Sequence, residues 1–162
     1  MITLGEIPHG LEELINCYGN PDKDGDFILD SYFVDTFLRI MPLPFPMRLS
    51  WQPERLIQKI QCHKDILPVL ADALREIGEK GFGYLDENKF NWYGGCFNFR
   101  KNRRHDWLSV HSWGVAIDIN PQLAPLGVRK HKQPQFIIDA FTKRGFINIP
   151  DDVQHFQACD GY

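Results

Sequence analysis

The segment from Ser109 to Asp118 constrains the fold more than any other stretch, because it places a histidine and a carboxylate on either side of a glycine. His111 and Asp118 are both metal-ligand types. Fully extended, their separation would span roughly 23 Å at about 3.3 Å per residue, whereas the ligands of one metal ion such as zinc each lie about 2.0–2.2 Å from it. If both bind one ion, the chain must turn back between them. Gly114 is the natural place, because glycine adopts positive φ without steric cost.

The residues after Gly114 predict a strand. From 115 to 120 the sequence Val-Ala-Ile-Asp-Ile-Asn alternates apolar residues with small or polar ones. This period of two sends Asp118 to the face opposite the apolar residues, beside the small side chain of Ala116. We therefore expect Asp118 to point away from the core, with room beside it for an ion or a substrate.

A histidine and an aspartate make only half of a metal site, so a third ligand is needed. The best candidate is near the C-terminus, where His155 is followed by Phe156 and Gln157. Asp152 lies three residues before this histidine. We predict that His155 completes the ligand set and that Asp152 shares the cavity without binding the metal.

Two motifs in these segments resemble those of a known enzyme family. The first is Ser-x-His-x-x-Gly-x-Ala-x-Asp, and the second is acid-x-x-His-Phe. Together they resemble the zinc peptidoglycan peptidases that include VanY-type D-alanyl-D-alanine carboxypeptidases and phage L-alanyl-D-glutamate endopeptidases. The resemblance runs from about residue 7 to residue 157, and the string His-Ser-Trp-Gly-x-Ala-Ile-Asp-Ile-Asn-Pro is most similar to the phage and prophage branch.

The resemblance implies a fold. It implies an α+β domain in which a small antiparallel sheet carries the zinc site and is flanked by helices, as in hedgehog and D,D-peptidase domains. We expect one domain over residues 1–162, with a helical N-terminal part at about 7–81 and a metal-site core at about 82–157.

The resemblance also assigns roles to individual residues. It implies one Zn²⁺ per chain, held by His111, Asp118 and His155, with the fourth position open, as in catalytic zinc sites. Asp152 resembles the family's catalytic acid and base. Arg100 matches an active-site arginine that would neutralise an oxyanion or hold a substrate carboxylate. Ser109 either binds substrate or has a structural role.

The expected activity is hydrolysis of the peptide stem of bacterial peptidoglycan, between L-alanine and D-glutamate, by a phage or prophage endolysin. A D-alanyl-D-alanine carboxypeptidase is the alternative enzyme, and a hedgehog-like zinc-bearing binding module is the alternative without catalysis. One departure concerns specificity. Relatives usually carry a Trp-Gly-Gly-rich segment after the position of Gly145 and Phe146, whereas this chain has Ile-Asn-Ile-Pro at 147–150.

Charge and composition limit the partners and the location. The net charge of −3 argues against a nucleic-acid partner. The basic cluster at 100–105 is either a solvated loop or a site that captures an anionic substrate. No apolar run approaches the roughly 20 residues of a membrane span, and the N-terminus lacks the pattern of a signal peptide. We expect synthesis in the cytoplasm, no insertion into a membrane, and action on the cell wall after release through a membrane lesion. Nothing in the sequence indicates the oligomeric state.

The remaining segments give a coarse outline. Helices are expected at 10–18, at 53–80 with an interruption at Pro68, and at 133–144. The proline-rich run 41–46 predicts an extended surface segment, residues 83–99 predict one or two strands, and the loop 121–127 is a plausible wall of the cleft. The acidic run 22–26 resembles an EF-hand only superficially, because Phe27 and Phe33 occupy the places of the required glycine and glutamate. The four cysteines form no Cys-x-x-Cys pair and are expected to be reduced.

Overall fold

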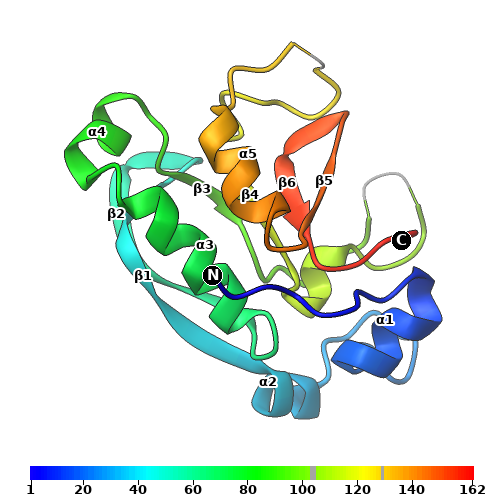
Figure 1. Ribbon diagram of the computed structural model, residues 1–162. Coiled ribbons are helices and arrows are strands. Elements are labelled where there is room, and N and C mark those ends of the chain that lie inside the picture. The colour runs from blue at the N-terminus through cyan, green and yellow to red at the C-terminus, as the bar shows by residue number, and fades with distance from the viewer. Residues whose placement is uncertain (103–104, 129) are drawn as a thin grey trace.

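The computed structural model describes residues 1–102, 105–128 and 130–162. Within these residues six strands form one sheet in the order β2-β1-β3-β4-β6-β5 (Figure 1). The strands are β1 (Leu38–Leu49), β2 (Gln52–His63), β3 (Trp92–Gly95), β4 (Ala116–Ile119), β5 (Ile147–Ile149) and β6 (Asp152–Gln157). The α+β class is confirmed. The sheet is not purely antiparallel as predicted, because β1 and β3 run parallel, while the other neighbouring pairs are antiparallel.

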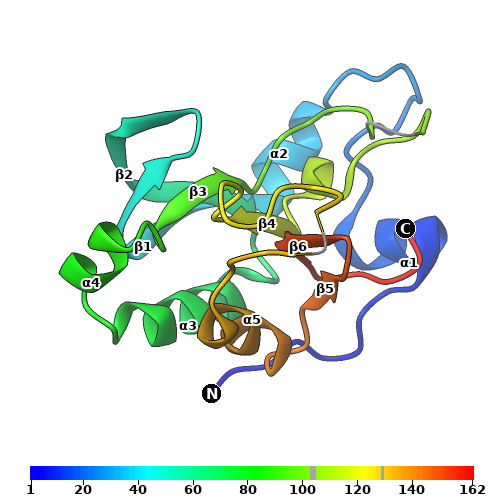
Figure 2. The same cartoon turned by 90° about the horizontal axis from the view of Figure 1, so that it is seen from above.

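Helices flank this sheet. They are α1 (Gly10–Tyr18), α2 (Ser31–Phe37), α3 (Leu67–Gly78), α4 (Phe82–Glu87), α5 (Gln135–Thr142) and the 3₁₀ helix η1 (Val110–Trp113). Figure 2 shows α3 and α5 side by side on one face of the sheet. The rings of Phe141 on α5 and Phe156 on β6 stack there with centroids 4.3 Å apart, and each buried side chain of this size contributes about 1.5–3 kcal/mol. Because successive strand residues alternate faces, His155 points to the opposite face.

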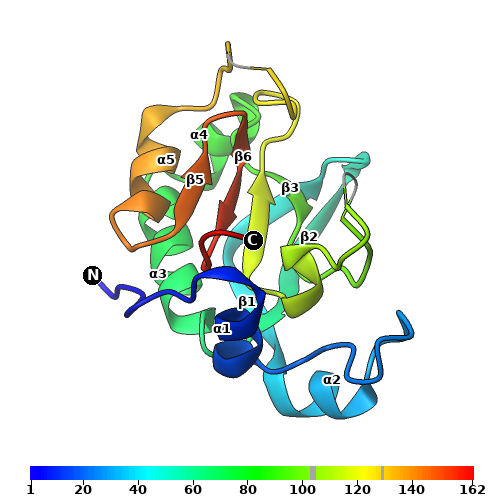
Figure 3. The same ribbon diagram turned by 90° about the vertical axis from the view of Figure 1, so that its right-hand side faces the viewer.

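The terminal segments are tied to this core by hydrogen bonds. The Leu4 N–H donates to the Arg144 carbonyl at 2.8 Å, and the Asp160 N–H donates to the Pro8 carbonyl at 2.9 Å. The Tyr18 hydroxyl on α1 donates to the Ala158 carbonyl at 3.1 Å. Figure 3 shows the result, with the C-terminal segment lying beside α1. These contacts close the fold around the strand that carries His155.

The proline-rich run was predicted to be a surface segment and is instead part of strand β1. Its pairing with β2 is interrupted between Pro42 and Met47, and its pairing with β3 involves only Arg48 and Leu49. Proline cannot donate a backbone hydrogen bond and is tolerated at bulges and unpaired edges. Pro44 and Pro46 therefore lie within the break in the ladder, and Pro42 lies at its edge, opposite Lys59.

The prediction of helix from 53 to 80 is wrong for its first half. Residues 52–63 form β2, a strand with many exposed positions, and only α3 is helical. Pro68 lies in the first turn of α3 and does not interrupt a longer helix. Local spacing of Leu56, Ile57 and Ile60 fits a helix, but the long antiparallel pairing with β1 determines the outcome. Such tertiary pairing overrides local propensity.

Residues 83–99 also differ from the predicted strands, because their first part forms α4 and only residues 92–95 form a strand. The acidic run is a polar turn, in which the Asp22 carboxylate accepts the N–H groups of Asp26 and Phe27 at 3.1 and 3.2 Å. All four cysteines have free thiols. Among the described residues, no helix has the length and apolar character needed to span a membrane.

Candidate metal centre

Strand pairing places two of the predicted ligands together. In the antiparallel pair of β4 and β6, Asp118 lies directly opposite His155. Directly opposed residues have Cβ atoms about 4.5–5.5 Å apart, so their side chains meet on the same face. The His155 Nδ1 lies 2.8 Å from the Asp118 Oδ1. The register of the sheet thus joins residues far apart in the sequence.

A tight turn brings the third predicted ligand, His111, close to Asp118. His111 lies on η1, and Gly114 ends this helix in the left-handed conformation at φ 69°, with its N–H donating to the His111 carbonyl at 3.0 Å. This is the reversal expected at Gly114. A side chain at this position would also approach the His63 backbone N to 3.0 Å. The turn leaves the His111 Nε2 3.3 Å from the Asp118 Oδ2.

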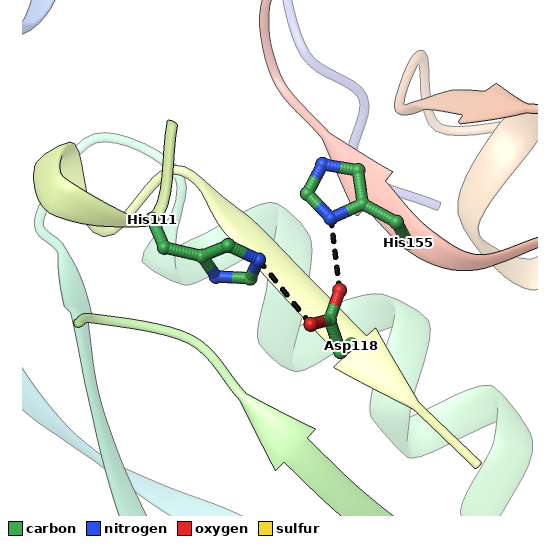
Figure 4. Close-up of side chains that lie close together, drawn as sticks. All are labelled: His111, Asp118 and His155. Carbon is green, nitrogen blue, oxygen red and sulfur yellow. Dashed lines mark hydrogen bonds and ion pairs between the residues drawn. The ribbon is translucent and has the colours of Figure 1, made fainter. Parts of the chain in front are cut away.

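The three side chains form a compact donor set, with one atom from each lying within 4.8 Å of the others. Figure 4 shows both imidazoles directed at the Asp118 carboxylate, one toward each oxygen. Two ligands of one zinc ion are at most about 4.4 Å apart, since each lies about 2.0–2.2 Å from it. Two nitrogens and a carboxylate oxygen match the ligand types that zinc prefers. The set fits zinc after a small adjustment.

Electrostatics keep Asp118 ionised. Burial by itself would raise the pKa of Asp118, but hydrogen bonds and charge from His111 and His155 hold it well below its usual range. Burial by itself would lower the pKa of His155, yet the hydrogen bond and the charge of Asp118 raise it. A cation bound here would replace the proton that His155 and Asp118 share.

The surrounding backbone orients His111. Its Nδ1 lies 2.8 Å from the Cys96 carbonyl oxygen, which can only accept a hydrogen bond. Nδ1 therefore donates to this carbonyl, and Nε2 is the ring nitrogen directed at Asp118. This is the arrangement expected of a metal-binding histidine.

Gly94 on β3 leaves space for Asp118. A Cβ atom built on Gly94 would lie 2.7 Å from the Asp118 Cβ and 3.2 Å from its carbonyl oxygen. Contacts under 3.0 Å are not tolerated without movement. The close approach of β3 to β4 at the site thus requires glycine at this position.

Asp152 borders the same cleft at the start of β6. Between β5 and β6 the register shifts after Asn148, because the stretch from Asp152 to Phe156 is longer than its partner. The Asn148 amide fills this bulge by donating to the Val153 and His155 carbonyls at 3.0 and 2.8 Å. Bulges of this kind re-aim side chains beside functional sites. Burial raises the pKa of Asp152, and a hydrogen bond from Gln154 opposes the shift.

Arg100 and Ser109 also line the cleft, which has a volume of about 290 Å³. Ser112 anchors the Arg100 backbone, since its hydroxyl accepts the Arg100 N–H and donates to the Arg100 carbonyl, both at 3.0 Å. Ser109 is buried, and its N–H donates to the same carbonyl at 2.9 Å. Of the predicted basic cluster, residues 103 and 104 lie outside the described part of the chain.

Part of the chain is similar to a known protein family. Residues 100–158 match a family described as D-alanyl-D-alanine carboxypeptidase. The match supports the resemblance of this segment to the VanY-type zinc peptidases. It contains every predicted site residue, from Arg100 to His155. No curated protein matches the chain, and no solved structure matches it.

Several residues that line the cleft were not predicted as part of the site. They are Trp107, Leu126 and Asp151, which lie in the matched segment, and Tyr162, which lies after it. Leu126 belongs to the loop expected to form a cleft wall. Gln157 contacts His155, and its position two residues after a ligand on a strand was the one available signal, because it implies the same face.

Proposed function

We propose that this protein is a zinc-dependent peptidase that hydrolyses the peptide stem of bacterial peptidoglycan. The observation that carries the proposal is the convergence of His111, Asp118 and His155 at one point, inside a segment that matches a zinc peptidase family. Asp152 and Arg100 border the same cleft, so the groups needed for peptide hydrolysis lie around one cavity. Residues 1–162 act as one catalytic unit in this proposal, because β1 and β2 share a sheet with β4 and β6.

Three protein ligands would hold the metal: His111 through Nε2, His155 through Nδ1 and Asp118 through its carboxylate. A zinc ion in such a site supplies a Lewis acid and lowers the pKa of water from 15.7 to roughly 7. Substituting His111 or His155 by alanine is expected to abolish zinc retention. Full zinc occupancy in either variant would remove that residue from the ligand set.

Asp152 would act as the general base and acid. As a carboxylate it accepts a proton from the attacking water, and as the acid it delivers this proton to the nitrogen of the departing amine. Its raised pKa supports the role, because a proton carrier works best when its pKa approaches the working pH. The Gln154 amide, which donates to the Asp152 carboxylate at 3.1 Å, holds the group in place.

Arg100 would supply positive charge on the other side of the reaction. A guanidinium binds a carboxylate through paired hydrogen bonds, or neutralises charge that develops on the peptide oxygen. Ser112 fixes the backbone that carries it. Ser109 lies in the same cleft and would hydrogen-bond the substrate backbone.

For the bond that is cleaved, we propose the link between L-alanine and D-glutamate. The phage-like string from His111 to Pro121 supports it, and Arg100 could pair with a carboxylate of D-glutamate. The alternative is removal of terminal D-alanine, which the description of the matching family favours. In that reaction Arg100 would bind the terminal carboxylate.

Mass analysis of digested muropeptides separates these two reactions. An endopeptidase releases a stem that begins with D-glutamate and leaves L-alanine on the sugar. Loss of one alanine from an otherwise intact sugar-linked stem would contradict the endopeptidase. The control is Asp152→Asn, which keeps the ligand set and is expected to form product about 10²–10⁴-fold more slowly.

The same digestion tests the alternative of a hedgehog-like binding module. Such a module would retain zinc and give no product from any muropeptide. The carboxylate of Asp152 beside the ligands favours an enzyme, because binding alone needs no proton carrier.

The proposed setting is the cell wall, reached from the cytoplasm after a phage or prophage opens the membrane. Expression in the cytoplasm is then expected to lyse cells only when a membrane-permeabilising agent is added. Lysis without permeabilisation would contradict this route.

A further inference from the structure

Gln157 bridges a candidate ligand and the backbone. It follows His155 by two residues on β6, so both side chains lie on the cleft face. The Gln157 Oε1 lies 2.8 Å from the His155 Nε2, and its Nε2 donates to the Cys159 carbonyl oxygen at 2.9 Å. Its partner across the sheet is Ala116, whose small side chain leaves room for the amide. With 4% of its surface exposed, Gln157 is a buried side chain fixed at both ends.

These contacts require a proton on the Nε2 atom of His155. A backbone carbonyl can only accept a hydrogen bond, so the amide nitrogen of Gln157 must face Cys159. The amide oxygen then faces His155, and because this oxygen can only accept, the His155 Nε2 must donate. The opposite ring nitrogen, Nδ1, is directed at Asp118, as Figure 4 shows.

We propose that Gln157 is a positioning residue that holds His155 with Nε2 protonated and Nδ1 presented to the metal. The inference rests on the proposed metal site and adds a residue to it. Partners that bind the second nitrogen of a ligand histidine fix its tautomer and ring orientation, and their removal weakens metal binding about 10–100-fold.

His111 offers a contrast within the same site. Its second nitrogen is bound by the Cys96 backbone carbonyl, which no side-chain substitution removes. His155 depends on a side chain for the same function. The two histidines therefore present different nitrogens, Nε2 of His111 and Nδ1 of His155, and only the second arrangement is sensitive to mutation of its partner.

The first test reads the tautomers directly. In zinc-loaded wild-type protein with ¹⁵N-labelled histidine, long-range proton–nitrogen correlation spectra distinguish the protonated ring nitrogen from the metal-bound one. We expect His155 to show a proton on Nε2 and zinc on Nδ1, and His111 to show the reverse. Zinc on the His155 Nε2 would overturn the proposal without the need for any variant.

The second test measures zinc affinity by chelator competition in Gln157→Met, whose side chain has a similar length and no strong acceptor. Affinity is expected to fall about 10–100-fold, with loss of the His155 Nε2 proton signal. The matched control is Gln133→Met. Gln133 is also buried and also donates to a backbone carbonyl, that of Ile119, at 3.0 Å. Zinc affinity in this control should stay near the wild-type value.

The outcomes separate this inference from the proposed function. Absence of zinc binding by the wild-type protein would overturn the proposed function and the inference with it. Zinc binding by the wild type that is equally tight in Gln157→Met would overturn the inference alone. An equal loss of affinity in Gln133→Met would mean general loosening of the sheet, and would also overturn it.

Discussion

Replacing Gly94 by alanine would test how closely the sheet is fitted around Asp118. The added methyl group would lie 2.7 Å from the Asp118 Cβ, about 0.7 Å less than the 3.4 Å at which ordinary contact begins. The Asp118 Cβ moves only with its backbone, so β4 itself must shift. Overpacking of this kind typically costs about 1–3 kcal/mol in the free energy of unfolding.

The same shift should weaken metal binding. A displacement of about 0.7 Å exceeds the roughly 0.5 Å within which a binding constellation must be held. We expect zinc affinity to fall by about tenfold or more, which corresponds to about 1.4 kcal/mol. Chelator competition measures the affinity, and urea unfolding of the metal-free protein measures the stability.

Gly83→Ala is the matched control, because no atom lies within 4 Å of a Cβ built at Gly83 in α4. It should leave zinc affinity unchanged and raise stability by about 0.5–1 kcal/mol, since alanine is the better helix residue. If folded Gly94→Ala bound zinc as tightly as the wild type and unfolded at the same urea concentration, the close approach of β3 to Asp118 would be refuted.

Three further predictions concern rate and stability. Asp152→Asn should retain zinc and lose about 10²–10⁴-fold in kcat. In the wild type, kcat/KM should fall on acidification at a pH above the usual aspartate pKa of about 3.9, because the pKa of Asp152 is raised. A pH profile of the variant should lack this fall. Arg100→Lys should retain zinc and lose about 10²–10³-fold in kcat, and steady-state kinetics with unchanged kcat would exclude its role. The Ile2 N–H and Arg144 hold the pKa of Asp72 well below its usual range, so its stabilising contribution is present above the unfolded pKa of about 3.9 and lost as the pH falls toward the folded pKa. Asp72→Asn should therefore flatten the decline in the free energy of unfolding between about pH 4 and about pH 2, as measured by urea unfolding.

Local sequence signals predicted the parts of the fold that local interactions determine. The helix 10–18 was predicted with its observed bounds, and the turn at Gly114 and the strand after it were also predicted, because glycine conformation and residue alternation act over a few residues. The approach of His111 to Asp118 followed from the same turn. The convergence with His155 was expected from ligand chemistry and from the resemblance, while the structure adds the β4–β6 register that produces it.

Long-range pairing explains what the sequence could not show. Residues 52–63 have apolar spacing that also fits a helix, and only their pairing with β1 makes them a strand. The small space beside Asp118 depends on Gly94, a residue of another strand. The function of Gln157 depends on the Cys159 carbonyl, whose position is set by the chain after β6. None of these contacts has a local sequence pattern.

The most direct measurement is a crystal structure of the protein grown with zinc, with anomalous diffraction recorded at the zinc absorption edge. We predict one peak per chain, about 2.0–2.2 Å from the His111 Nε2, the His155 Nδ1 and the Asp118 carboxylate, with no fourth protein ligand. A peak elsewhere, no peak at all, or a fourth protein group on the ion would contradict a catalytic zinc site.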